Sequence, residues 1–113
     1  MSIEDLMADL KISYIADLPQ KIKTIQDHLE QGSTEQVRDG FHKLKGTGKT
    51  YGLPEVSELC ALLEKLCIEQ EDRIGEFAPL GIQLLNHIHQ LRSKDETPDL
   101  ENHSSYKQLK ELS

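Results

Sequence analysis

The sequence predicts an all-α protein, specifically an antiparallel up-down four-helix bundle with a kinked N-terminal helix. Apolar residues recur in steps of three and four along four segments, and no segment alternates apolar and polar residues as a half-buried strand does. The connections between the segments are short and contain glycine or proline, as they do between antiparallel neighbours in a bundle. The chain has 113 residues, the length of one domain.

The first predicted helix begins after Ser2, whose hydroxyl is placed to cap it. Pro19 lies in the middle of this helix and predicts a kink or a break, because it lacks a backbone donor and crowds the preceding turn. Gly32 ends the helix, and Ser33 or Thr34 opens the next one. The apolar stripe consists of Ile3, Leu6, Leu10, Tyr14, Leu18, Ile22, Ile25 and Leu29.

Three further helices follow at about residues 34–51, 54–70 and 77–91. Pro54 suits the first turn of the third helix, since a proline there loses no helical hydrogen bond. Pro79 lies in the first turn of the fourth helix or kinks it, and the pattern does not decide between the two.

The domain is expected to span residues 1–93, and residues 94–113 are expected to form a polar, flexible tail. From Lys94 onward the helical pattern is lost in a run rich in charged and small polar residues. The last apolar side chains, Tyr106, Leu109 and Leu112, recur at helical spacing and fit one or two further helical turns.

The net charge of −7, from 13 Lys and Arg against 20 Asp and Glu, argues against binding to nucleic acid or to an anionic membrane. The charge is uneven: residues 38–49 carry a local charge of +3, and residues 55–76 carry −5.

No apolar run approaches the roughly 20 residues that span a bilayer. The start of the chain lacks the basic region of a signal peptide. Cys60 and Cys67 lie about 10 Å apart on one helix, too far for a disulfide, so a cytoplasmic protein with reduced thiols is expected.

The second predicted helix carries the residues most suited to chemistry. On a helical wheel His42 lies opposite the apolar stripe, and Arg38, Lys45 and Lys49 lie within about 60° of it. Nearby cations favour the neutral, nucleophilic imidazole and would stabilise an anionic group bound to it. Gly46, one turn further on, leaves space beside the ring. This arrangement suits the acceptance of a phosphoryl group, which needs positioning and positive charge.

A glycine inside a helix costs up to about 1 kcal/mol relative to alanine, so several of them suggest a steric need. This helix contains Gly40, Gly46 and Gly48. The alternative interpretation is an ordinary solvated histidine on a basic helix face. That interpretation leaves the lysine at plus three and the glycine at plus four from His42 unexplained. No glycine-rich phosphate loop is present, so an ATP site is not expected.

The segment His42-Lys43-Leu44-Lys45-Gly46, together with Gly52 and the later pair Leu63-Glu64, resembles the histidine-containing phosphotransfer (HPt) domain of the bacterial stand-alone type. The resemblance covers roughly residues 5–93. It implies that His42 is phosphorylated on its outward ring nitrogen and that Lys45 lies beside the phosphoryl group. It also implies that Gly46 leaves room for a receiver domain and that Gly52 shapes the turn before the next helix.

The same resemblance implies a phosphocarrier rather than an enzyme. It would act in a two-component phosphorelay, with response-regulator receiver domains and a hybrid sensor kinase as partners. The chain would need no cofactor or metal of its own, because the receiver would hold the Mg²⁺, and it would be a monomer. Arg38 and Lys49 are expected to help in docking. Phe41 and Tyr51 depart from the family pattern in size, and Phe41 is expected to pack in the core.

Two other functions compete with this one. A non-phosphorylated docking module would use the same face and regulate a partner by occupancy. A metal-binding or ligand-binding bundle is disfavoured, because it needs inward-facing histidines or carboxylates and the predicted inward positions are apolar. His87 and His89 are two residues apart on a helix and point in different directions, so they make a poor metal pair.

Overall fold

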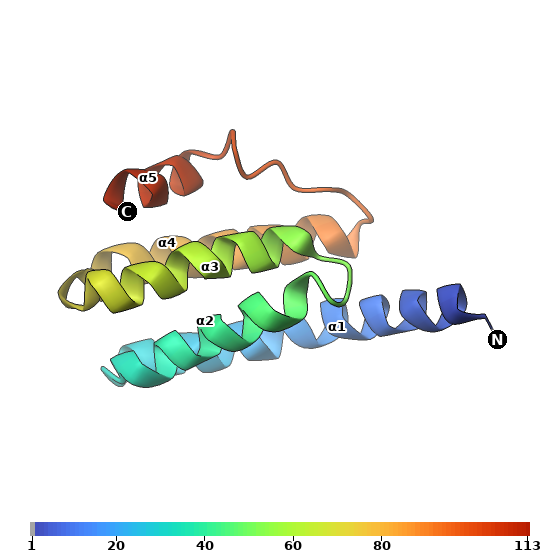
Figure 1. The fold of residues 1–113 in the computed structure, drawn as a ribbon, viewed down its shortest axis with the longest axis horizontal. Coiled ribbons are helices and arrows are strands. Elements are labelled where there is room, and N and C mark those ends of the chain that lie inside the picture. The colour runs from blue at the N-terminus through green and yellow to red at the C-terminus, as the bar shows by residue number, and fades with distance from the viewer. Residues whose placement is uncertain (1) are drawn as a thin grey trace.

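Five α-helices and one short 3₁₀ helix make up the computed structural model, which describes residues 2–113. No strand occurs in this part of the chain, so the all-helical prediction is confirmed. Helices α1 to α4 run alternately in opposite directions, and α5 lies on the side of α3 and α4 away from α1 (Figure 1). The elements are α1 (Ile3–Glu30), α2 (Thr34–Gly48), α3 (Pro54–Glu69), η1 (Glu71–Arg73), α4 (Ile74–Ser93) and α5 (Ser104–Leu112).

Helix α1 is capped at its start as predicted, since the Ser2 hydroxyl accepts a hydrogen bond of 3.1 Å from the backbone amide of Asp5. The helix continues through Pro19, so the predicted break is absent, and a kink there stays a prediction. Gly32 follows the helix with a φ of +74°, a conformation that a side chain disfavours. The amide of Ser33 then donates to the carbonyl of His28 at 2.9 Å and closes the helix end.

The turn between α2 and α3 depends on two glycines. Gly52 has a φ of +91°, which a glycine adopts without strain. At Gly48 the two helices are in close contact, because a Cβ atom there would lie 2.8 Å from Oγ of Ser57 and 2.9 Å from Cβ of Val56. Helix α3 then begins at Pro54, as expected. The last turn of α2 is therefore fixed against the first turn of α3.

Helix α4 begins at Ile74, a turn before the predicted start, and Pro79 lies inside it beyond the first turn. Gly81 allows α4 to approach α3, since a Cβ atom there would lie 2.6 Å from the methyl groups of Leu63. An ion pair also joins these two helices. The Arg92 side chain donates from Nε to Glu55 at 2.6 Å and from Nη2 to the other oxygen at 3.0 Å, with both side chains almost buried.

The core lies between the helices and is formed by the predicted stripes. Phe41 is fully buried, as expected. Cys60 and Cys67 are both buried and unpaired, and burial raises the pKa of Cys67 to about 11. The largest fully buried side chains are Phe41, Phe77, Leu18, Ile22, Leu53, Leu59, Leu63, Leu66, Leu84, Leu85, Ile88 and Leu109. In the part of the chain that the structure describes, no helix is both long and apolar enough to cross a membrane.

The expectation of a flexible tail at residues 94–113 is wrong. Residues 104–112 form α5, which buries Tyr106 and Leu109 against α3 and α4, and the preceding segment buries Leu100. The Gln70 side chain donates to the backbone carbonyl of Leu112 and ties the end of α5 to the end of α3. Three inward apolar side chains in a polar segment are enough to dock it, because each is removed from water.

Candidate functional site

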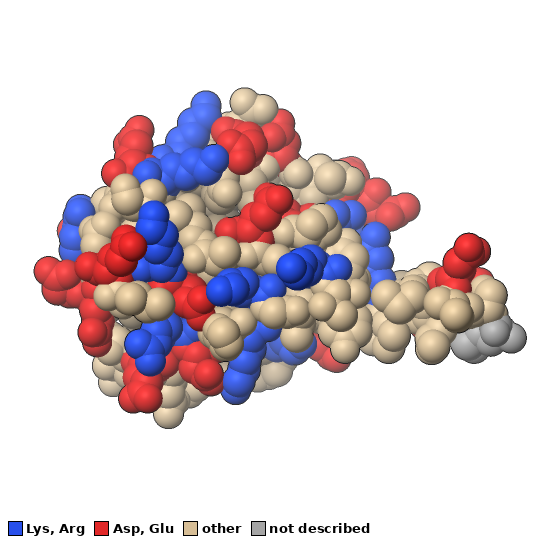
Figure 2. Space-filling model, in the orientation of Figure 1, with Lys and Arg blue, Asp and Glu red and all other residues tan. Residues whose placement is uncertain are grey.

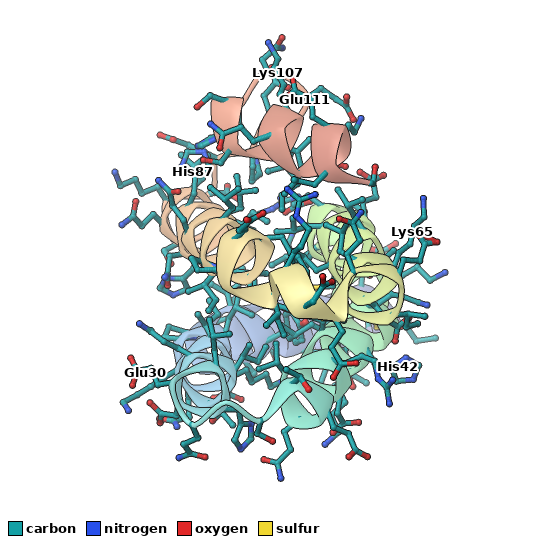
Figure 3. All side chains as sticks on the ribbon, turned by 90° about the vertical axis from the view of Figure 1, so that its left-hand side faces the viewer. Glu30, His42, Lys65, His87, Lys107 and Glu111 are labelled. Carbon is teal, nitrogen blue, oxygen red and sulfur yellow. The ribbon has the colours of Figure 1, made fainter. Side chains whose placement is uncertain are left out.

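His42 lies on the outer face of α2, with 64% of its side chain exposed. Figure 3 shows the ring pointing away from the helices at the edge where α2 faces α3. The apolar stripe of α2 holds this orientation, because Val37, Phe41 and Leu44 are buried on the opposite side of the helix. The imidazole is therefore open to a partner that approaches from solvent.

Glu64 of α3 connects the ring to a lysine. Its Oε2 atom lies 2.5 Å from Nδ1 of His42, and its Oε1 atom accepts a hydrogen bond of 2.8 Å from Nζ of Lys45. A carboxylate only accepts hydrogen bonds, so Nδ1 carries the proton. The neutral ring then keeps its lone pair on Nε2, the nitrogen on the other side.

The carboxylate of Glu64 is held in its charged form. The hydrogen bond from Lys45 is the main cause that lowers its pKa, and the hydrogen bond from His42 adds to this against partial burial. The sequence predicts that only cations surround His42. This prediction is wrong, because the Glu64 carboxylate lies between the ring and Lys45. Glu64 is the site residue that was not selected from the sequence, although the pair Leu63-Glu64 was a usable signal.

Gly46 differs from the other glycines of α2. A Cβ atom at Gly40 would lie 2.5 Å from the Ile25 side chain, and one at Gly48 would meet α3. At Gly46 nothing lies within 4 Å of such an atom, so packing inside this chain does not require glycine there. Packing inside the chain therefore explains the glycines at positions 40 and 48, as the predicted steric need requires. The space at Gly46 opens to solvent instead.

Ser57 of α3 fixes the turn of α2 that carries the lysines. Its hydroxyl accepts a hydrogen bond of 2.7 Å from the backbone amide of Lys49 and donates one of 2.8 Å to the carbonyl of Lys45. One hydroxyl thus pairs with a backbone amide and a backbone carbonyl near the end of α2, where the last carbonyl groups lack partners within the helix. This contact holds the backbone of Lys45 against α3, the helix that carries Glu64.

The remaining predicted residues lie on both sides of His42. Arg38 shares a shallow depression with His42 and Glu64 at one end of the site. Lys49 and Gly52 lie towards the turn between α2 and α3, where the Lys11 side chain packs over Gly52. Figure 2 shows basic side chains across the middle of the face where α2 and α3 meet, with acidic side chains around them. The residues form one surface rather than a closed pocket.

No group of three or more histidine, cysteine, aspartate or glutamate side chains among residues 2–113 is arranged to hold a metal ion. Comparison with protein-family models gave a match to the family described as Hpt domain, over residues 9–94. A search of curated proteins and a search of solved structures gave no match.

Proposed function

This chain belongs to the Hpt domain family, and on that premise we propose that it carries a phosphoryl group on His42 in a two-component phosphorelay. The family is one of phosphocarriers that act in histidine phosphotransfer. The observation that supports His42 as the acceptor is its contact with Glu64 through Nδ1, which leaves Nε2 as the lone-pair nitrogen of the neutral ring in an exposed side chain. Among residues 2–113, no other histidine combines this exposure with a carboxylate and a lysine.

The transfer step follows from this geometry. The lone pair on Nε2 attacks the phosphorus of an aspartyl phosphate on the partner, so an N–P bond forms while the O–P bond breaks. The electron pair of that bond leaves with the aspartate carboxylate. Nδ1 keeps its proton, so the ring becomes cationic, and Glu64 stabilises the new positive charge at 2.5 Å.

Lys45 and Gly46 have separate parts in this proposal. Lys45 is 42% exposed and uses one of its three donors on Glu64, so the others can reach the phosphoryl oxygens. Gly46 leaves the surface beside the ring flat, so that a receiver domain can bring its aspartate close. The basic surface, with Arg38 and Lys49, complements the acidic site in which a receiver would hold Mg²⁺. We expect the partners to be receiver domains and a hybrid sensor kinase, in the cytoplasm.

The test is transfer from a receiver domain that carries a radiolabelled phosphoryl group. Wild-type protein is expected to take up label that is labile in acid and stable in alkali, whereas His42→Gln takes up none. His89→Gln on α4 is the control and is expected to behave as wild type. Label retained on His42→Gln would disprove the site. If the protein takes up no label but His42→Gln keeps its biological effect, the chain is instead a docking module.

A further inference from the structure

The first turns of α1 project beyond the rest of the molecule and expose an apolar face. The exposed fractions there are 80% for Ile3, 48% for Leu6, 43% for Met7 and 37% for Leu10, and the helix becomes buried only at Tyr14. Figure 1 shows this end of α1 extending past the turn between α2 and α3, and Figure 2 shows acidic side-chain atoms at one edge of it. The other helices end before they can cover it.

These side chains form a continuation of the core stripe. On a helical wheel Leu6, Met7 and Leu10 lie within about 60° of Ile3, and Tyr14 follows in the same phase. Ile12 is also 65% exposed, but it lies about 180° from this line. The projecting stripe is therefore a helix face of the kind that α2 to α4 cover further along, and it lacks a partner in this chain.

On one flank of the stripe the charges fit a second copy of the same helix, and the other flank carries Asp9. Glu4 and Lys11 are seven residues apart, so they lie about 20° apart on one flank. Neither forms an ion pair with another described residue, although the aliphatic part of Lys11 packs over Gly52. When two identical helices pack antiparallel, the same flanks face each other. Lys11 of one copy would then lie about 3 Å along the axis from Glu4 of the other.

We propose that residues 3–11 of α1 pack antiparallel against the same segment of a second copy, with the two-fold axis near Leu6 and Met7. Ile3 would then lie opposite Leu10, and the pair of Glu4 with Lys11 would form twice, as an isologous interface requires. The patch is smaller than a standard interface, so association is weak and concentration-dependent. This dimer would replace the monomer expected from the sequence, and it does not depend on the proposed phosphotransfer.

Sedimentation equilibrium over a range from micromolar to about millimolar tests the proposal. Wild type is expected to self-associate, and Leu6→Glu is expected to weaken the association constant at least tenfold, because it places two carboxylates at the two-fold axis. The control is Ile12→Glu, an equally drastic change on the opposite face, which is expected to leave the constant within twofold. Circular dichroism checks that both variants keep the helical fold. A wild-type protein that stays monomeric, or equal effects of both variants, would overturn the proposal.

A charge exchange gives a second readout. Lys11→Glu and Glu4→Lys are each expected to weaken association, and the double variant is expected to restore most of it. A double variant as weak as the single ones would overturn the antiparallel register. Sedimentation with phosphatidylcholine vesicles tests the competing use of the face. Binding of the monomer to vesicles, without self-association, would overturn the proposed dimer.

Discussion

The Nδ1 atom of His42 on α2 lies 2.5 Å from the Oε2 atom of Glu64 on α3, so the carboxylate sets the proton position on the ring. Glu64→Gln keeps the shape of the side chain but removes the negative charge of the carboxylate, whose two oxygens contact His42 and Lys45. A charge-assisted hydrogen bond contributes about 1.5–3 kcal/mol, so we expect phosphotransfer to His42 to slow by about tenfold or more. Rapid-quench measurement of labelled transfer checks this. Glu58→Gln, an exposed change on the same helix, is the control, and equal rates for both variants would contradict the role of Glu64.

The same carboxylate predicts a pH dependence of stability. Because the pKa of Glu64 is lower in the folded protein than in the unfolded chain, its contribution is present above the unfolded pKa and is lost as the pH falls towards the folded pKa. Glu64→Gln should therefore be less stable than wild type at pH 7, and the difference should shrink below about pH 4. Urea unfolding at both pH values measures it. A difference that stays constant with pH would contradict this assignment.

Gly46 and Gly48 should respond in opposite ways to the same substitution. Gly46→Ala adds a methyl group in open space and should stabilise α2 by about 0.5–1 kcal/mol, while slowing transfer from a receiver that must approach the ring. Gly48→Ala should destabilise the protein, because its Cβ would lie 2.9 Å from the Ser57 backbone nitrogen. Urea unfolding and labelled transfer on both variants separate the two effects. Unchanged transfer for Gly46→Ala would show that the receiver does not use this space.

The ion pair of Arg92 with Glu55 is expected to matter far more than an exposed one. Its side chains are only 11% and 9% exposed, and the hydrogen bonds that Arg92 donates to Glu55 raise the pKa of Arg92. Arg92→Ala leaves a carboxylate almost buried without a partner and should cost about 3 kcal/mol of unfolding free energy. Arg73→Ala, which breaks an exposed pair with Glu76, should cost less than about 1 kcal/mol. Equal losses in thermal or urea unfolding would contradict this distinction.

The parts of the site that lie on one helix could be predicted from the sequence. The spacing of His42, Lys45 and Gly46 follows from helix geometry alone, and so does the exposure of the ring. Glu64 could not be placed in the same way, because its contact with His42 spans 22 positions and depends on the angle at which α3 packs on α2. Gly48 allows α2 to approach α3 closely at Ser57, and the periodicity of apolar residues does not report such a contact.

The fold was predictable where apolar residues recur often enough to define a helix face. The four stripes identified α1 to α4, although the start of α4 and the 3₁₀ turn before it were not found. Helix α5 was expected only as one or two further turns in a flexible tail, because a polar run precedes it and only Tyr106, Leu109 and Leu112 mark its inner face. The position of α5 depends on its packing against α3 and α4, which its own short sequence does not reveal.

Leu109 provides the test of whether α5 belongs to the folded unit. Its side chain is fully buried between α5 and the α3–α4 surface, so Leu109→Ala should lower the unfolding free energy by about 2–5 kcal/mol through lost burial and a residual cavity. Ile68→Ala removes an apolar side chain that is 64% exposed at the end of α3 and should cost less than about 0.5 kcal/mol. Urea unfolding followed by circular dichroism measures both. If α5 were an independent, undocked segment, the two variants would unfold at the same urea concentration as wild type.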